Sequence, residues 1–89
     1  MTDQTWQRDD NWVGSEVEDS FVMVNIDSGK YVSLNATASA VWQALEAPAT
    51  QAEVEARVRA IFDVPADRCH ASVTRLLAEM RQLELAAPR

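Results

Sequence analysis

The stretch VMVNIDSGKYVSLNATASAVWQAL, residues 22–45, decides the fold of this 89-residue chain. Residues 21–26 are rich in branched and aromatic side chains, which is typical of a half-buried strand. Residues 27–30 predict a four-residue turn, because Gly29 is free to take a positive φ angle. Tyr31–Leu34 then returns as the next strand. The stretch therefore predicts a β-hairpin that leads directly into a helix.

Helical periodicity begins after Leu34. Asn35 is expected to be the N-cap, with Thr37 as the alternative if the helix begins later. Apolar residues then recur at helical spacing and predict a buried stripe made of Ala38, Val41, Trp42 and Leu45. Pro48 predicts the end of this helix.

Upstream of the hairpin, residues 13–17 predict one more strand, so that the sheet is a three-stranded antiparallel meander. Side chains alternate along a strand, so Tyr31 and Ser33 share one face of the third strand. Val32 and Leu34 share the other face, which should point to the helices. The outer edge of this strand is expected to offer unpaired amides and carbonyls.

Two further helices are predicted downstream. Thr50 and Glu53 match a capping box, which opens a helix whose buried face is Val54, Val58, Ile61 and Phe62. Pro65 favours the first turn of a third helix, over residues 66–84. Its apolar side is Cys69, Val73, Leu76, Leu77, Met80 and Leu83. Strands followed by helices predict an α+β domain with the helices on one face of a small sheet.

The composition limits the partners. With 47% apolar and 25% charged residues, the chain is of ordinary globular type and long enough for one domain. Its formal net charge of −6 is unsuited to the phosphates of nucleic acids and to anionic membranes. A peptide that carries Lys or Arg, or a basic enzyme surface, would suit it better.

The residues give no sign of catalysis. His70 is the only histidine and Cys69 the only cysteine. Adjacent side chains on a helix point about 100° apart, so these two cannot bind the same metal ion. No metal site, cofactor or internal disulfide is predicted, and two glycines cannot build a phosphate loop. The protein is therefore expected not to be an enzyme. The N-terminal residues do not form a signal peptide, so a cytoplasmic location is expected.

Leu34-Asn35-Ala36-Thr37, followed by Val41-Trp42 and Leu45, resembles the PqqD-like family position by position. Residues 61–65 and 83–85 resemble the second half of the family's pattern. The resemblance covers roughly residues 13–85, whereas residues 46–49 depart from the family's usual Asp-Gly. Residues 1–12 are a lead-in that could pack back through Trp6 and Trp12, and residues 86–89 are a tail.

The resemblance implies a winged helix-turn-helix-like fold that recognises the leader of a ribosomally made precursor peptide. The leader would add a strand at the outer edge of the third strand, beside the third helix. Carried onto this sequence, the edge is Lys30, Tyr31, Val32, Ser33 and Leu34, and the opposing wall is Arg68, Cys69, Ser72, Val73, Leu76 and Met80. Arg68 or Arg75 is expected near the rim, where it would meet acidic leader residues.

The resemblance also implies a separate modifying enzyme: a radical SAM enzyme, a lasso-peptide leader protease or another tailoring enzyme. Two alternatives remain open. One is a winged-helix DNA-binding regulator, although the third helix mixes Arg68, Arg75 and Arg81 with Asp67, Glu79 and Glu84. The other is an adaptor that binds only its partner enzyme. A homodimer through the same strand edge is also left open.

Overall fold

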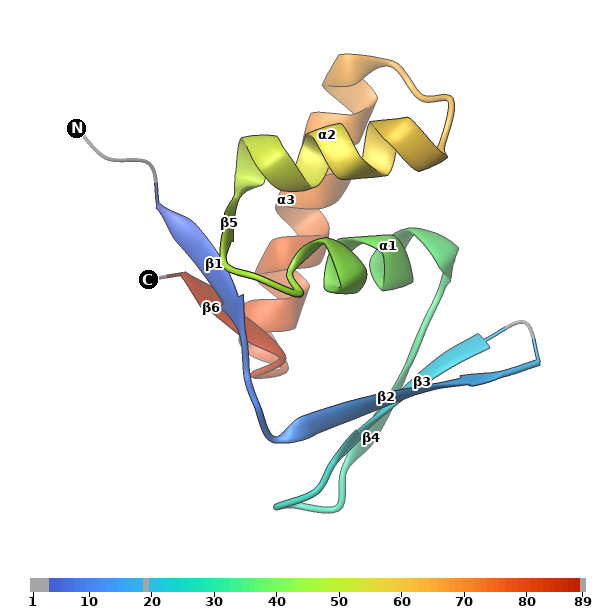
Figure 1. Ribbon diagram of the computed structural model, residues 1–89, viewed down its shortest axis with the longest axis vertical. Coiled ribbons are helices and arrows are strands. Elements are labelled where there is room, and N and C mark those ends of the chain that lie inside the picture. Colours follow the sequence, from blue (N-terminus) through green and yellow to red (C-terminus); the bar gives the residue numbers. More distant parts are fainter. Residues whose placement is uncertain (1–3, 19, 89) are drawn as a thin grey trace.

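Two small antiparallel sheets and three helices make up the described part of the chain, residues 4–18 and 20–88 of a computed structural model (Figure 1). In chain order the elements are β1 (Thr5–Arg8), β2 (Trp12–Val17), β3 (Ser20–Asn25), β4 (Tyr31–Leu34), α1 (Ala36–Ala44), β5 (Ala49–Thr50), α2 (Gln51–Ile61), α3 (Ala66–Gln82) and β6 (Ala86–Pro88). The sheet orders are β2-β3-β4 and β5-β1-β6. The predicted α+β fold, with a three-stranded antiparallel meander followed by three helices, is confirmed.

The meander is held by the turn between β3 and β4. The side-chain oxygen of Asn25 accepts hydrogen bonds from the amides of Asp27 and Ser28, at 2.9 and 3.0 Å. Gly29 has a φ of 77°, the left-handed conformation that it was predicted to be free to adopt. The β3–β4 register then pairs Val24 with Tyr31 and Phe21 with Leu34, so that Leu34 faces the helices.

The second sheet joins three distant segments and was not predicted. β1 pairs with β5 on one side and with β6 on the other. Beside it, the Arg8 guanidinium donates two hydrogen bonds, of 2.9 and 2.6 Å, to the backbone oxygen of Trp42 and lies 4.4 Å from the centre of the Trp42 ring. These contacts fasten the N-terminal strand to α1.

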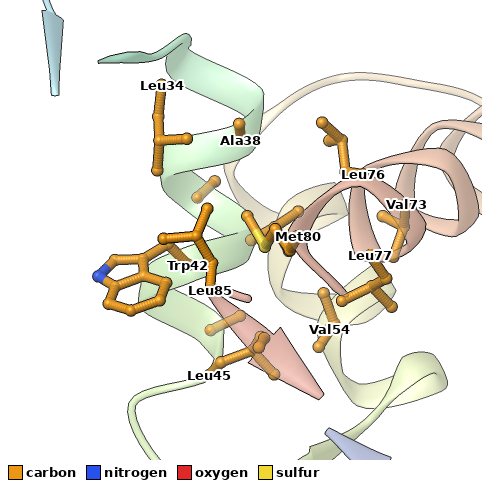
Figure 2. Packing of buried hydrophobic residues seen from close by; sticks show 14 of the residues in the cluster. Leu34, Ala38, Trp42, Leu45, Val54, Val73, Leu76, Leu77, Met80 and Leu85 are labelled. Atoms are coloured by element: carbon orange, nitrogen blue, oxygen red, sulfur yellow. The ribbon is translucent and has the colours of Figure 1, made fainter. Parts of the chain in front are cut away.

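The core lies between the helices, and α1 separates α2 from the meander (Figure 1). Side chains from all three helices and from the residue before β6 meet there, and Figure 2 labels among them Trp42, Leu45, Val54, Val73, Leu76, Leu77, Met80 and Leu85. The predicted stripe of α1 is buried throughout. The expectation that Ile61 is buried was wrong: this side chain is 62% exposed, because α2 ends here and the chain turns away.

The helix starts follow the sequence signals, whereas one helix end does not. Asn35 caps α1 through the amide of Ala38, and Thr50 and Glu53 form the predicted capping box of α2. α3 ends at Gln82 rather than at residue 84, because Glu84 takes a left-handed φ of 63°. The Leu85 amide then donates to the Met80 oxygen at 2.8 Å, which closes the helix end as in a Schellman motif.

Candidate functional site

The outer side of β4 is an open strand edge, because β3 is its only neighbour within the described residues. The Asn25 amide donates to the Lys30 oxygen at 2.7 Å, so these two residues form a hydrogen-bonded pair. In an antiparallel ladder such pairs alternate with non-bonded ones. Every second residue of β4 after Lys30 therefore faces β3, and Tyr31 and Ser33 direct their backbone N–H and C=O groups to the open side.

A groove runs between this edge and the C-terminal half of α3, and we call it the β4–α3 groove. It consists of two hollows of about 140 and 580 Å³ that share Val32 and Leu83. The smaller hollow is mostly apolar and is lined by Val32, Ser33, Leu34, Asn35, Ala38, Leu76, Glu79, Met80, Leu83 and Leu85. The larger hollow continues past Tyr31 to the β3–β4 turn. The groove thus lies beside the same strand edge that is free to pair.

The two walls of the groove run in opposite directions. Leu34 and Leu76 line one end of the groove, and Tyr31 and Glu84 line the other. A strand added to β4 would therefore also lie along α3, over about two turns of the helix.

Seven of the predicted site residues line this groove together. They are Lys30, Tyr31, Val32, Ser33 and Leu34 from the strand and turn, and Leu76 and Met80 from α3. Tyr31 is 75% exposed and lies on the face of the sheet opposite to Leu34. Val32 is half-buried and is the β4 side chain that both hollows share.

The four remaining predicted residues lie on earlier turns of α3 and do not line the groove. Val73 has no exposed surface, and Cys69, 1% exposed, points its Sγ at the backbone oxygen of Glu55 on α2, at 3.6 Å. Burial, with a smaller contribution from Glu55, raises the pKa of the Cys69 thiol. Arg68 is exposed and Ser72 half-buried. The wall opposite β4 is therefore the last part of α3 rather than its first part.

Several groove residues were not among the predicted site residues, including Glu79, Leu83 and Leu85 in the smaller hollow and Asp9, Asp27 and Glu84 in the larger one. Leu83 is 47% exposed although it ends the apolar stripe of α3, which leaves a large apolar side chain at the groove rim. Leu76, Glu79, Met80 and Leu83 are spaced three or four residues apart and so share one helix face. This spacing would have identified Glu79 and Leu83 as neighbours of the predicted Leu76 and Met80.

No group of three His, Cys, Asp or Glu side chains among the described residues could hold a metal ion. The one ion pair in this part of the chain joins His70 Nδ1 to Glu55 Oε2 at 2.8 Å, between α3 and α2 and outside the groove. No helix in the described ranges is long and apolar enough to cross a membrane.

Comparison with known proteins gives one family. The model of the family described as coenzyme PQQ synthesis protein D (PqqD) matches residues 20–86. No curated protein matches.

Two solved structures share the fold. TbiB1 in complex with the TbiA(beta) leader peptide has a TM-score of 0.76 and 22% identity, over 90% of this chain and 93% of that one. Lasso peptide synthetase B1 complexed with the leader peptide has a TM-score of 0.76 and 19% identity, over 93% and 98% of the two chains. Because the family model spans most of the sequence, from β3 to the first residue of β6, the chain belongs to the PqqD family.

Proposed function

We propose that this chain is a non-catalytic cytoplasmic protein that binds the leader of a ribosomally made precursor peptide in the β4–α3 groove. Membership of the PqqD family supports this proposal, as does the fold shared with two proteins solved in complex with leader peptides. The observation that carries it is the open edge of β4, whose outward-facing residues lie directly beside an apolar groove. An extended peptide is the ligand that uses both features at once.

In this proposal the peptide becomes a fourth strand of the meander. Its backbone pairs with the outward N–H and C=O groups of Tyr31 and Ser33, which gives affinity with little dependence on sequence. The peptide residue opposite Val32 has its side chain on the same face as Val32, because cross-strand partners share a face. That side chain enters the groove towards Met80 and Leu83. Its burial, if it is large and apolar, contributes roughly 1.5–3 kcal/mol.

The bound leader would hold the rest of the precursor near a separate modifying enzyme. Such tethering raises the effective concentration of the substrate without any new contact at the reacting centre. The protein itself makes and breaks no bond in this scheme. A radical SAM enzyme, a lasso-peptide leader protease and another tailoring enzyme remain the candidate partners, and self-association through the β4 edge would compete with the leader.

The experiment is a fluorescence anisotropy titration with a labelled leader peptide from a precursor encoded beside this chain's gene. Ser33→Pro removes one outward amide and spares the β3–β4 ladder, as prolines on edge strands do. We expect saturable binding to the wild type and a loss of roughly tenfold or more in the variant, since a lost hydrogen bond costs about 1 kcal/mol and the proline ring also obstructs pairing.

Glu16→Pro is the matched control. The Ile26 amide donates to the Asn11 oxygen at 2.8 Å, so alternate residues of β2 face β3 and Glu16 faces outward on the opposite edge of the same sheet. The affinity of the Glu16→Pro variant for the leader should equal that of the wild type. Unchanged binding by a folded Ser33→Pro variant would reject strand addition at β4. Failure of the folded wild type to bind any neighbouring leader would favour the adaptor that contacts only an enzyme.

A further inference from the structure

The charged side chains of the β4–α3 groove are mostly acidic, and they gather at one end. The hollow at the β3–β4 turn is lined by the acidic residues Asp9, Asp27 and Glu84 and by the basic residue Lys30. Glu79 adds a fourth carboxylate on the α3 wall. At the other end, around Leu34 and Leu76, the lining is apolar or uncharged apart from Glu79.

These carboxylates have no cation of their own in the described part of the chain. Among residues 4–18 and 20–88, the one ion pair within 4.0 Å is that of His70 and Glu55. Arg81 lines a neighbouring hollow together with Asp9 and Glu84 but forms no ion pair with either. The Arg8 guanidinium is engaged with Trp42. The acidic end of the groove is thus left to interact with a ligand.

We propose that the leader segment lying against the β3–β4 turn carries Lys or Arg, and that this charge fixes which way round the peptide lies in the groove. The inference rests on the proposed function and adds the chemistry of its ligand. Electrostatic complementarity discriminates between partners mainly by penalising like charges, so acidic residues at this end of the peptide are disfavoured. The net charge of −6 favours the same sign of ligand at longer range.

This inference agrees with the basic peptide that the net charge favours, but differs from the acidic leader residues expected at the groove rim. Arg68 or Arg75 was expected near the rim to meet acidic leader residues, but neither lines the groove. The side chains that do line its charged end select a basic segment. Asp9, Asp27 and Glu84 line one end, and Glu79 is the one acidic residue lining the smaller hollow, so the effect of a basic residue should depend on its position in the peptide.

The test uses two series of variants of the labelled leader described above. In the first series the peptide carries two Lys, two Gln or two Glu at one end of its binding segment. In the second series the same substitutions stand at the other end. Exposed ion pairs contribute about 0.2–1 kcal/mol each, so we expect Lys to bind roughly two- to tenfold more tightly than Gln at one end. Glu should bind more weakly than Gln there. At the other end the three versions should agree within about twofold, and raising the salt to about 1 M should remove the difference.

A charge-matched pair of double variants distinguishes the effect of the acidic groove residues from the effect of the overall net charge. Asp27→Asn with Glu84→Gln should abolish the advantage of the Lys version, whereas Asp63→Asn with Glu46→Gln, outside the groove, should retain it. Equal affinities of the three versions at each end, or an equal Lys advantage at both ends, would overturn the inference while the Gln version still binds. If no version binds the folded protein, the proposed function fails and the inference fails with it.

Discussion

Gly14 in β2 is the residue on which the packing of the β2–β3 hairpin depends. A Cβ atom added at this position would overlap the ring of Phe21 and lie 3.0 Å from Sδ of Met23. We therefore expect Gly14→Ala to lower the free energy of unfolding by about 1 kcal/mol, the low end of the cost of overpacking, because the half-buried Phe21 ring can swing aside. Urea denaturation monitored by circular dichroism measures this cost.

The control is the Phe21→Leu variant, in which the ring no longer occupies the space next to Gly14. Gly14→Ala should cost less in the Phe21→Leu background than alone, as expected for residues in direct contact. Additive costs would show that the strain lies elsewhere.

The wall of the groove shows what residue patterns leave undecided. Leu76 and Met80 line the groove, whereas Cys69 and Val73, members of the same apolar stripe, pack inward against other helices. Periodicity identifies the buried side of a helix. Which turns of that side meet a helix and which meet β4 depends on the lengths and crossing of α1, α2 and α3, which no local pattern contains.

Among the elements, α2 owes its start to Thr50 and Glu53. The Thr50 amide donates to Oε1 of Glu53 at 2.9 Å, and the Thr50 hydroxyl oxygen accepts from the Glu53 amide at 3.2 Å. The hydrogen bonds from Thr50 lower the pKa of Glu53. Because the folded-state pKa lies below the unfolded one, the carboxylate contributes stability above the ordinary pKa of Glu, and this contribution is lost as the pH falls through the folded value.

Glu53→Gln should therefore be less stable than the wild type at pH 7, and the difference should shrink as the pH is lowered towards 3, measured by urea denaturation at a series of pH values. Thr50→Ala removes the hydroxyl but keeps the backbone amide that contributes most to the lowered pKa of Glu53, so it should cost about 1 kcal/mol at pH 7 and depend less on pH than Glu53→Gln. A Glu53→Gln difference that is independent of pH would contradict the assigned hydrogen bonds.

The sequence patterns of the individual elements explain which of them could be predicted. The meander and the three helices carry alternation, capping residues or helical periodicity, and their order gave the fold class. β5 and β6 have two and three residues, which is too short for any period to be visible. The second sheet exists because Trp6 of β1 pairs with Ala49 on one side and with Pro88 on the other, a consequence of the completed fold.

At the scale of the whole molecule, Arg8 connects the N-terminal strand to the helical core across 34 residues of sequence. Burial lowers the pKa of its guanidinium, and the nearby Glu46 carboxylate opposes that shift. Lys cannot reproduce two hydrogen bonds to one oxygen together with stacking on Trp42. Arg8→Lys should therefore lower the free energy of unfolding by about 1–3 kcal/mol, measured by urea denaturation.

Arg57→Lys, an exposed position on α2, is the matched control and should change stability by less than about 0.5 kcal/mol. The leader affinity of both variants should match that of the wild type, because neither position lines the groove. Equal stability of the two variants would mean that the contact of Arg8 with Trp42 contributes little.

The pairing of β1 with β6 has a further consequence. Trp6 lies opposite Pro88 in antiparallel strands, so the two ends of the described chain leave the molecule at one place. A domain whose ends meet can be spliced into a surface loop of a larger protein with little disturbance to either partner. The architecture is thus suited to insertion within a longer chain as well as to acting as a separate protein.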